Sequence, residues 1–179
     1  MRQKFVFDAT PLIHLAKAGL APLLVDLAGE KFTVPAVVDE VVGRAKGCGL
    51  GHPDAGIISS LIDEGALSVR KPPQEGAAKV AGLHRDIHRG EAEVLALAKA
   101  LKAIAVVDDR AARSAARIQG VRLEGTYGVV LRAVRGGSVT PREAEEHLGR
   151  LVSSGWRCDA ELYAALLRAL RKAGPGKGA

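Results

Sequence analysis

Residues 90–109, GEAEVLALAKALKAIAVVDD, carry the most regular pattern in the chain. Apolar side chains recur at helical spacing from Gly90 to Lys102, which predicts an amphipathic helix. The uninterrupted apolar run at 104–107 is typical of a parallel strand buried on both faces. Asp108 and Asp109 follow this run directly. The pattern therefore predicts a helix that leads into a buried parallel strand ending in two acids.

Four further short runs predict strands, at residues 4–7, 31–34, 67–70 and 121–124. They alternate with helical patterns, which favours an α/β fold with a central, mostly parallel sheet of about five strands. The Gly-rich stretch 43–53 is predicted to be a loop. Thr140, Pro141 and Glu143 form a helix-start signature. We expect a domain over 1–139, a helical extension over 140–173 packed on it, and a frayed tail over 174–179.

Composition narrows the class of protein. The 179 residues are 47% hydrophobic and 26% charged, which excludes a collagen-like or disordered chain and predicts a soluble globular domain. The two cysteines, Cys48 and Cys158, form no C-x-x-C pattern, so a disulfide framework or zinc ribbon is unsupported and a cytoplasmic location is expected. Apolar runs stay shorter than the roughly 18 residues of a membrane span.

Charge is distributed unevenly along the chain. The net charge is +6, with 13 basic and 14 acidic residues in 1–109 and 13 basic and 6 acidic residues in 110–179. This asymmetry predicts an acidic site in the first part and a basic surface in the second. Arg110 and Arg113, just beyond the Asp pair, are candidates for contacts to the phosphates of a polyanionic partner. A solvated helix face is an equally good interpretation of these arginines.

Acids from separate segments are expected at one edge of the sheet. Asp8 follows the first strand and Asp108–Asp109 follow the most buried one, so they project from the same edge, where ligands bind in such folds. Helices that start nearby supply the other candidates, Glu40, Glu91 and Glu93. Each acid alone has a simpler interpretation: Asp8 and Asp109 as helix caps, Glu91 and Glu93 as first-turn acids that favour the helix dipole.

Together, clustered carboxylates repel one another, and such a cluster usually holds a divalent cation. Oxygen ligands without Cys or paired His select a hard ion, Mg²⁺ or Mn²⁺, which keeps several waters. A hydrated ion of this kind stabilises charge on a phosphodiester and activates water. Metal-dependent phosphodiester hydrolysis is the predicted chemistry.

Five segments carry a resemblance to a known family. They are Phe7-Asp8-Ala9-Thr10-Pro11-Leu12-Ile13, residues 34–41 (VPAVVDEV), residues 90–98 (GEAEVLALA), residues 106–113 (VVDDRAAR) and residues 125–131 (GTYGVVL). In order and spacing they resemble the PIN-domain family, in particular its VapC-like prokaryotic branch with a G-E-A-E helix. The resemblance covers about the first 135 residues.

The resemblance implies a three-layer α/β/α domain with an acidic Mg²⁺ or Mn²⁺ site and ribonuclease activity on single-stranded RNA. By position, it implies metal acids at Asp8, Glu40, Glu93 and Asp108 or Asp109, with Glu91 as a close alternative to Glu93. Thr10 would fix Asp8 or a metal-bound water. Homodimers are frequent in the family, and its toxin members are neutralised by an antitoxin protein. The chain departs from compact toxins at 43–73 and at 140–179.

Two other classes of function compete with this one. A non-catalytic PIN-fold module would bind RNA or protein in a salt-sensitive, metal-independent way. A phosphotransfer domain also places an Asp after the first strand, but Thr10 stands where a dehalogenase-like D-x-D motif has its second Asp. The phosphotransfer class is therefore disfavoured.

Overall fold

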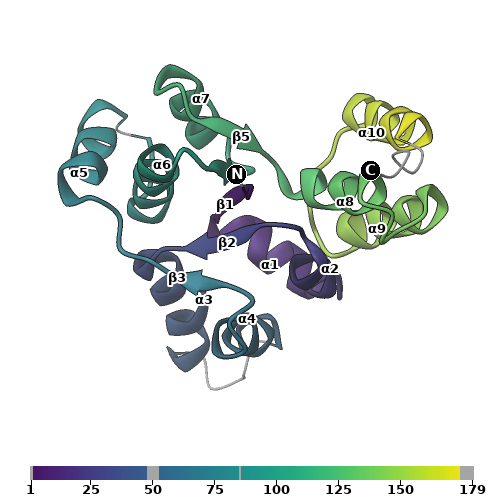
Figure 1. Cartoon of the computed structure of the whole chain (residues 1–179), viewed down its shortest axis with the longest axis horizontal. Coiled ribbons are helices and arrows are strands. Elements are labelled where there is room, and N and C mark those ends of the chain that lie inside the picture. The colour runs from purple at the N-terminus through teal and green to yellow at the C-terminus, as the bar shows by residue number, and fades with distance from the viewer. Residues whose placement is uncertain (1, 48–52, 85, 174–179) are drawn as a thin grey trace.

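The computed structural model describes residues 2–47, 53–84 and 86–173. Its centre is a sheet of five parallel strands in the order β3-β2-β1-β4-β5 (Figure 1). The strands are β1 (Lys4–Phe7), β2 (Glu30–Thr33), β3 (Ser68–Val69), β4 (Ile104–Val106) and β5 (Arg122–Glu124). The predicted α/β class with a parallel sheet of about five strands is confirmed.

Helices cover both faces of the sheet, which gives three layers. The first part of the chain contributes α1 (Ala9–Lys17), α2 (Pro22–Asp26), α3 (Pro35–Gly47), α4 (Pro53–Asp63) and α5 (Gln74–Leu83). The second part contributes α6 (Arg89–Leu101), α7 (Arg110–Ile118), α8 (Thr126–Arg135), α9 (Pro141–Ser153) and α10 (Ala160–Lys172). Helices α5, α6 and α7 lie on one side of the sheet, and α1, α2 and α4 lie on the other (Figure 1).

The register brings the carboxyl ends of the central strands to one level. Phe7 of β1 pairs with Val106 of β4, and Val106 pairs with Glu124 of β5. Beyond the strands, the Asp8 amide donates to the Val106 carbonyl at 3.1 Å and the Val107 amide donates to the Glu124 carbonyl at 3.0 Å. The chain leaves β1 toward β2 and leaves β4 toward β5, so the switch point between β1 and β4, where parallel sheets bind ligands, lies beside Asp8.

The core sits around the two middle strands. The side chains of Val6, Phe7, Ala105 and Val106 are fully shielded from solvent, because helices pack on both faces of β1 and β4. This is the environment that the apolar run at 104–107 predicts. One prediction is wrong: α3 continues through Gly47, so the first part of the expected loop over 43–53 is helical, while residues 48–52 lie outside the described residues.

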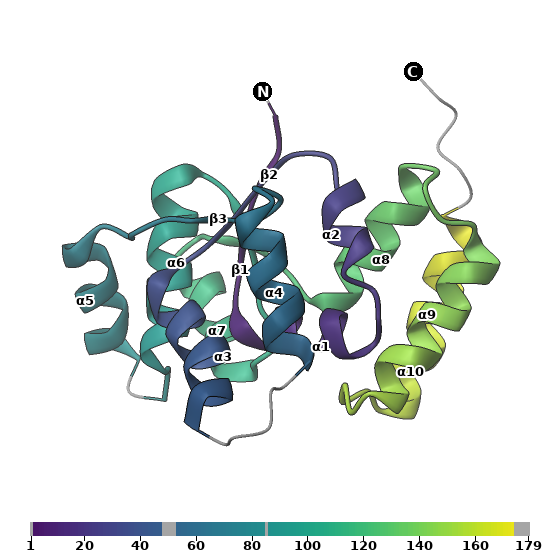
Figure 2. The same cartoon turned by 90° about the horizontal axis from the view of Figure 1, so that it is seen from below.

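The last three helices form a group beside α1 and α2 (Figure 2). Helix α9 starts at the predicted signature: the Thr140 hydroxyl accepts from the Glu143 amide at 3.2 Å, and the Glu143 carboxylate accepts from the Thr140 amide at 2.8 Å. The predicted tail, 174–179, lies outside the described residues. In the described part of the chain, every helix is too short or too polar to cross a bilayer.

Candidate active site

Asp8 is a buried carboxyl group at the end of β1, with only 3% of its surface exposed. Burial, assisted by the charges of Glu91 and Glu40, raises its pKa from 3.8 to about 7, although the peptide N–H groups of Ala9 and Thr10 act in the opposite direction. Asp8 occupies the N-cap position of α1 without making a capping hydrogen bond. The effect of these N–H groups on the Asp8 pKa is smaller than the effect of burial.

Glu40 and Glu91 come to the same place from two helices. Gly90, at the start of α6, packs against α3: a Cβ at this position would lie 3.5 Å from Val37 and 3.7 Å from Glu40 Oε2. Glu91 follows directly and is buried, and its Oε2 accepts from the His88 amide at 2.9 Å. Burial is also the main cause that raises the Glu91 pKa, with Asp109 and Glu40 adding to it. The three carboxylates of Asp8, Glu40 and Glu91 thus influence one another.

Glu93 faces a different partner. Its Oε1 accepts from Arg89 Nε at 2.8 Å, one turn earlier on α6. Asp109 caps α7, because its Oδ1 accepts from the amides of Ala111 at 2.7 Å and Ala112 at 2.9 Å. The cap interpretation of Asp109 is confirmed, while its charge still acts on Glu91.

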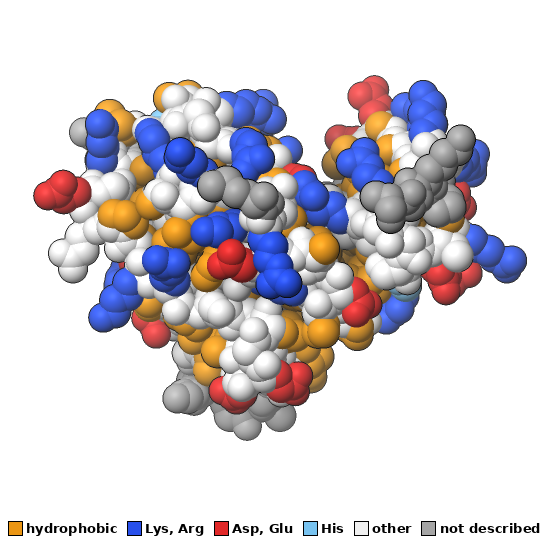
Figure 3. Space-filling model, in the orientation of Figure 1, with side chains coloured by type: hydrophobic (Ala, Val, Ile, Leu, Met, Phe, Trp, Pro, Cys, Tyr) orange, Lys and Arg blue, Asp and Glu red, His pale blue; other side chains and the backbone are white. Residues whose placement is uncertain are grey.

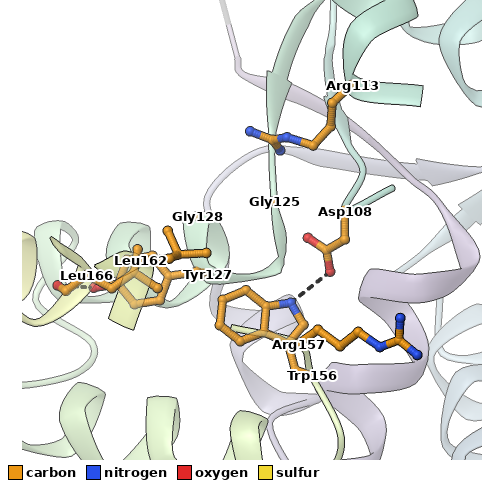
Figure 4. A pocket seen from close by; sticks show the side chains of 9 residues that line it. All are labelled: Asp108, Arg113, Gly125, Tyr127, Gly128, Trp156, Arg157, Leu162 and Leu166. Carbon is orange, nitrogen blue, oxygen red and sulfur yellow. Dashed lines mark hydrogen bonds between the residues drawn. The ribbon is translucent and has the colours of Figure 1, made fainter. Parts of the chain in front are cut away.

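Asp108 is held by hydrogen bonds from two other segments, of which Figure 4 shows the one from Trp156. Its Oδ1 accepts from the Thr126 amide at 2.8 Å, and its Oδ2 accepts from the Thr126 hydroxyl and from Trp156 Nε1 at 3.0 Å. Gly125 must lack a side chain here, because a Cβ would lie 2.8 Å from Asp108 Oδ1. Asp108 therefore ties the ends of β4 and β5 to the segment between α9 and α10.

A pocket of about 270 Å³ borders this contact, between Asp108 and the helices α8 and α10. Arg113 lies on its wall and donates from Nη1 to the Val107 carbonyl at 3.0 Å (Figure 4). Arg157 reaches the same wall from the chain after α9. Arg110 is exposed at the start of α7, and Thr10 is half-buried in the first turn of α1.

These acids suit a hard cation that keeps several of its waters better than a cation whose ligands all come from the protein. Within residues 2–47, 53–84 and 86–173, no three His, Cys, Asp or Glu side chains are gathered closely enough to ligate one ion directly. Mg²⁺ characteristically keeps several waters and binds through one or two carboxylates. A buried carboxyl with a raised pKa beside two further acids fits such an ion, because a positive charge would relieve both the burial cost and the repulsion.

Sequence reasoning did not single out two residues of this edge. Thr126 stands within the motif at 125–131, and the sequence pattern around Trp156 gives no sign of a link to the acids. Trp156 acts across 48 positions of sequence, so no local pattern connects it to Asp108. The available signal for Thr126 is a hydroxyl two residues after β5, since parallel strands end at one edge of the sheet.

Comparison with known proteins agrees with this architecture. A family model described as a PIN domain matches residues 4–172. The chain is also similar to Endoribonuclease Nob1 of Pyrococcus abyssi (strain GE5 / Orsay), with 34% identity over 99 residues, 52% of this chain and 56% of that protein. The chain thus spans about half the length of the curated relative it matches. PIN domains are in general nucleases that use divalent metal ions. Since the family model covers nearly all of the chain, the protein belongs to the PIN-domain family.

Proposed function

We propose that this chain is a Mg²⁺- or Mn²⁺-dependent endoribonuclease that hydrolyses phosphodiester bonds of single-stranded RNA. The observation that carries the proposal is the buried Asp8, whose pKa is raised to about 7 next to Glu40 and Glu91 at the switch point of the sheet. Burial of a carboxyl among like charges costs stability, and such groups are typical of functional sites. The family membership and the similarity to an endoribonuclease support the same activity.

We assign Asp8, Glu40 and Glu91 as the groups that hold the metal ion, directly or through its waters. For this role we favour Glu91 over Glu93, because the charge of Glu91 acts on Asp8 whereas Glu93 forms an ion pair with Arg89. Glu91 also accepts from the His88 amide through Oε2. Asp109 adds negative charge at the rim. Asp108 is assigned a positioning role, since Thr126 and Trp156 occupy both of its oxygens.

When bound, the divalent ion supplies Lewis-acid stabilisation of the charge that develops on the phosphoryl oxygens. The chain's own acids keep this edge of the sheet negative, with Asp8 held at the end of β1 and Glu40 and Glu91 held by helices α3 and α6. Thr10 and Ala9 direct peptide N–H groups toward Asp8 and so favour its ionised form. Arg110, exposed at the start of α7, is proposed to contact RNA phosphates.

The test is cleavage of a labelled single-stranded RNA by purified protein with Mn²⁺ or Mg²⁺ and with EDTA. We expect metal-dependent cleavage that is lost in Asp8→Asn and retained in Asp63→Asn, an exposed position on α4 that serves as the matched control. Cleavage by Asp8→Asn at the wild-type rate would overturn the site assignment.

A second candidate function is a non-catalytic module that binds RNA or protein. The net charge of +6 favours it, because a basic chain attracts a polyanion such as RNA without any metal ion. This function predicts RNA binding that survives both EDTA and Asp8→Asn, without cleavage under any metal condition.

The resemblance to VapC-like proteins supports one finer proposal, a cytoplasmic, homodimeric toxin neutralised by an antitoxin protein. Expression of the chain in a bacterial host is then expected to arrest growth, and Asp8→Asn to relieve the arrest. A neighbouring small gene should restore growth when it is co-expressed. Arrest by Asp8→Asn as strong as that by wild type would contradict a nuclease toxin.

A further inference from the structure

A basic hollow of about 840 Å³ lies at the amino ends of the strands, opposite the acidic edge. Lys4 begins the β1 side of this hollow and Arg122 the β5 side, while the end of α6 forms a third wall. Five cationic side chains line it, Arg2, Lys4, Lys99, Lys102 and Arg122, against one acid, Glu30. Figure 3 shows Lys and Arg side chains gathered over the middle of this face.

Carboxylates of the protein neutralise little of the positive charge in the hollow. Lys4 Nζ lies 4.0 Å from Glu30 Oε1, at the limit of an ion pair. Lys99 Nζ donates to the neutral Gln119 side chain at 3.1 Å, and Arg122 Nη2 donates to the Lys102 carbonyl at 2.7 Å. Among the described residues, Lys4 is the one cation of the five with a carboxylate partner. The hollow therefore presents an uncompensated positive field.

Local helix electrostatics explains only part of this set. Lys99 and Lys102 stand at the carboxyl end of α6, where cations are favoured by the helix dipole. Arg2, Lys4 and Arg122 belong to the N-terminal segment and to strands, where this argument does not apply. Their convergence on one concavity requires a different explanation.

Lys102 provides a second, independent observation. It has φ +52°, the single positive φ of a non-glycine residue among those described. The left-handed conformation costs a side-chain-bearing residue about 1–2 kcal/mol, and helices commonly end with glycine there. A lysine at this position gives up stability and directs a cation to the hollow.

We propose that the basic hollow binds the phosphate backbone of single-stranded RNA, away from the acidic edge. Guanidinium groups suit phosphate geometry, and the lysines act as point charges. The choice of RNA over an acidic protein segment rests on the proposed function, in which RNA is the substrate. The hollow then anchors a part of a long strand that is not being cut.

The experiment measures binding of long and short fluorescent oligouridylates by anisotropy in an Asp8→Asn background, which prevents cleavage. Each phosphate contact contributes about 0.7 to the slope of log affinity against log salt for single strands. At about 0.15 M salt this equals roughly a 4-fold affinity change per contact, so Lys102→Gly should weaken binding of the long RNA about 4-fold. The double variant Arg2→Ala/Lys102→Gly should weaken it about 14-fold and lower the slope by about 1.4.

Two controls separate the loss of a phosphate contact from effects on folding and on net charge. Lys102→Gly should melt at the same or a higher temperature than its parent, because glycine tolerates the positive φ. Lys79→Ala removes one exposed charge from α5 and should change the affinity less than 2-fold, as a small long-range effect. Equal binding of long RNA by the double variant and by Lys79→Ala would overturn the proposal. Binding of polyglutamate, but not of RNA, that depends on Lys102 would also overturn it.

Cleavage by the wild-type chain is measured in parallel, so that the two proposals fail separately. Lys102-dependent RNA binding without any cleavage would support the hollow while the ribonuclease proposal fails. Asp8-dependent cleavage, with binding indifferent to Arg2 and Lys102, would overturn the hollow alone.

Discussion

Asp8→Asn is expected to stabilise the metal-free protein at neutral and alkaline pH. The folded protein raises the pKa of Asp8 from 3.8 to about 7, so it holds this proton more tightly than the unfolded chain does. The stability associated with the proton is fully present below pH 3.8 and is lost as the pH rises through about 7. Asparagine mimics the protonated carboxyl and does not titrate.

Linkage gives the size of the effect. For these two pKa values the loss in wild type amounts to about 2 kcal/mol at pH 5 and about 4 kcal/mol at pH 8. The difference in free energy of unfolding, Asp8→Asn minus wild type, should therefore grow by about 2 kcal/mol between these pH values. Urea denaturation in EDTA at both values measures it. A difference that is constant with pH, or a variant that is less stable at pH 8, would refute the reasoning.

Addition of Mg²⁺ is expected to shift the comparison of stabilities in favour of wild type over Asp8→Asn. An ion that binds only the folded state adds stability according to its concentration over its dissociation constant. Wild type should gain stability on titration with Mg²⁺, and Asp8→Asn should gain little. An equal gain in both proteins would place the ion away from Asp8.

Three further predictions concern the two glutamates of α6 and the contacts of Asp108. Glu91→Gln should lower metal-dependent cleavage about 10- to 100-fold. Glu93→Gln should lose only the ion pair with Arg89, which contributes about 0.5 kcal/mol of stability. RNA cleavage assays of both variants separate the roles of the two glutamates. Trp156→Phe removes a donor from the Asp108 carboxylate and should destabilise the fold by about 1–3 kcal/mol in urea denaturation, and unchanged stability would remove Asp108 from its positioning role. Gly125→Ala places a Cβ 2.8 Å from Asp108 Oδ1 and should cost about 1–3 kcal/mol, with Gly43→Ala, where a Cβ meets nothing within 4 Å, as the control in the same unfolding assay.

The strands and their parallel order were predictable because β1 and β4 are buried on both faces, which leaves continuous apolar runs in the sequence. The convergence of acids at one edge followed from the same rule. The choice between Glu91 and Glu93 did not, because both stand in the first turns of α6. Only the packing of Gly90 against α3 and the Arg89 ion pair separate their surroundings.

The distribution of positive charge was predicted less well. The count along the sequence placed the basic surface after residue 109. Four of the five cations in the basic hollow come from residues 2–102, and only Arg122 comes later. Charge counted along the chain misses this convergence, since the starts of β1 and β5 and the end of α6 are neighbours only in the folded sheet.

The contact between Trp156 and Asp108 gives this protein an optical probe of its own. Trp156 is the single tryptophan of the chain, and it is 8% exposed. Its indole N–H donates a hydrogen bond to the Asp108 carboxylate, next to the acidic edge. Indole emission responds to nearby charge and to water. A change in the state of Asp108, whether from a cation nearby, an RNA strand or a shift of α9 and α10, is therefore converted into a fluorescence signal without any label.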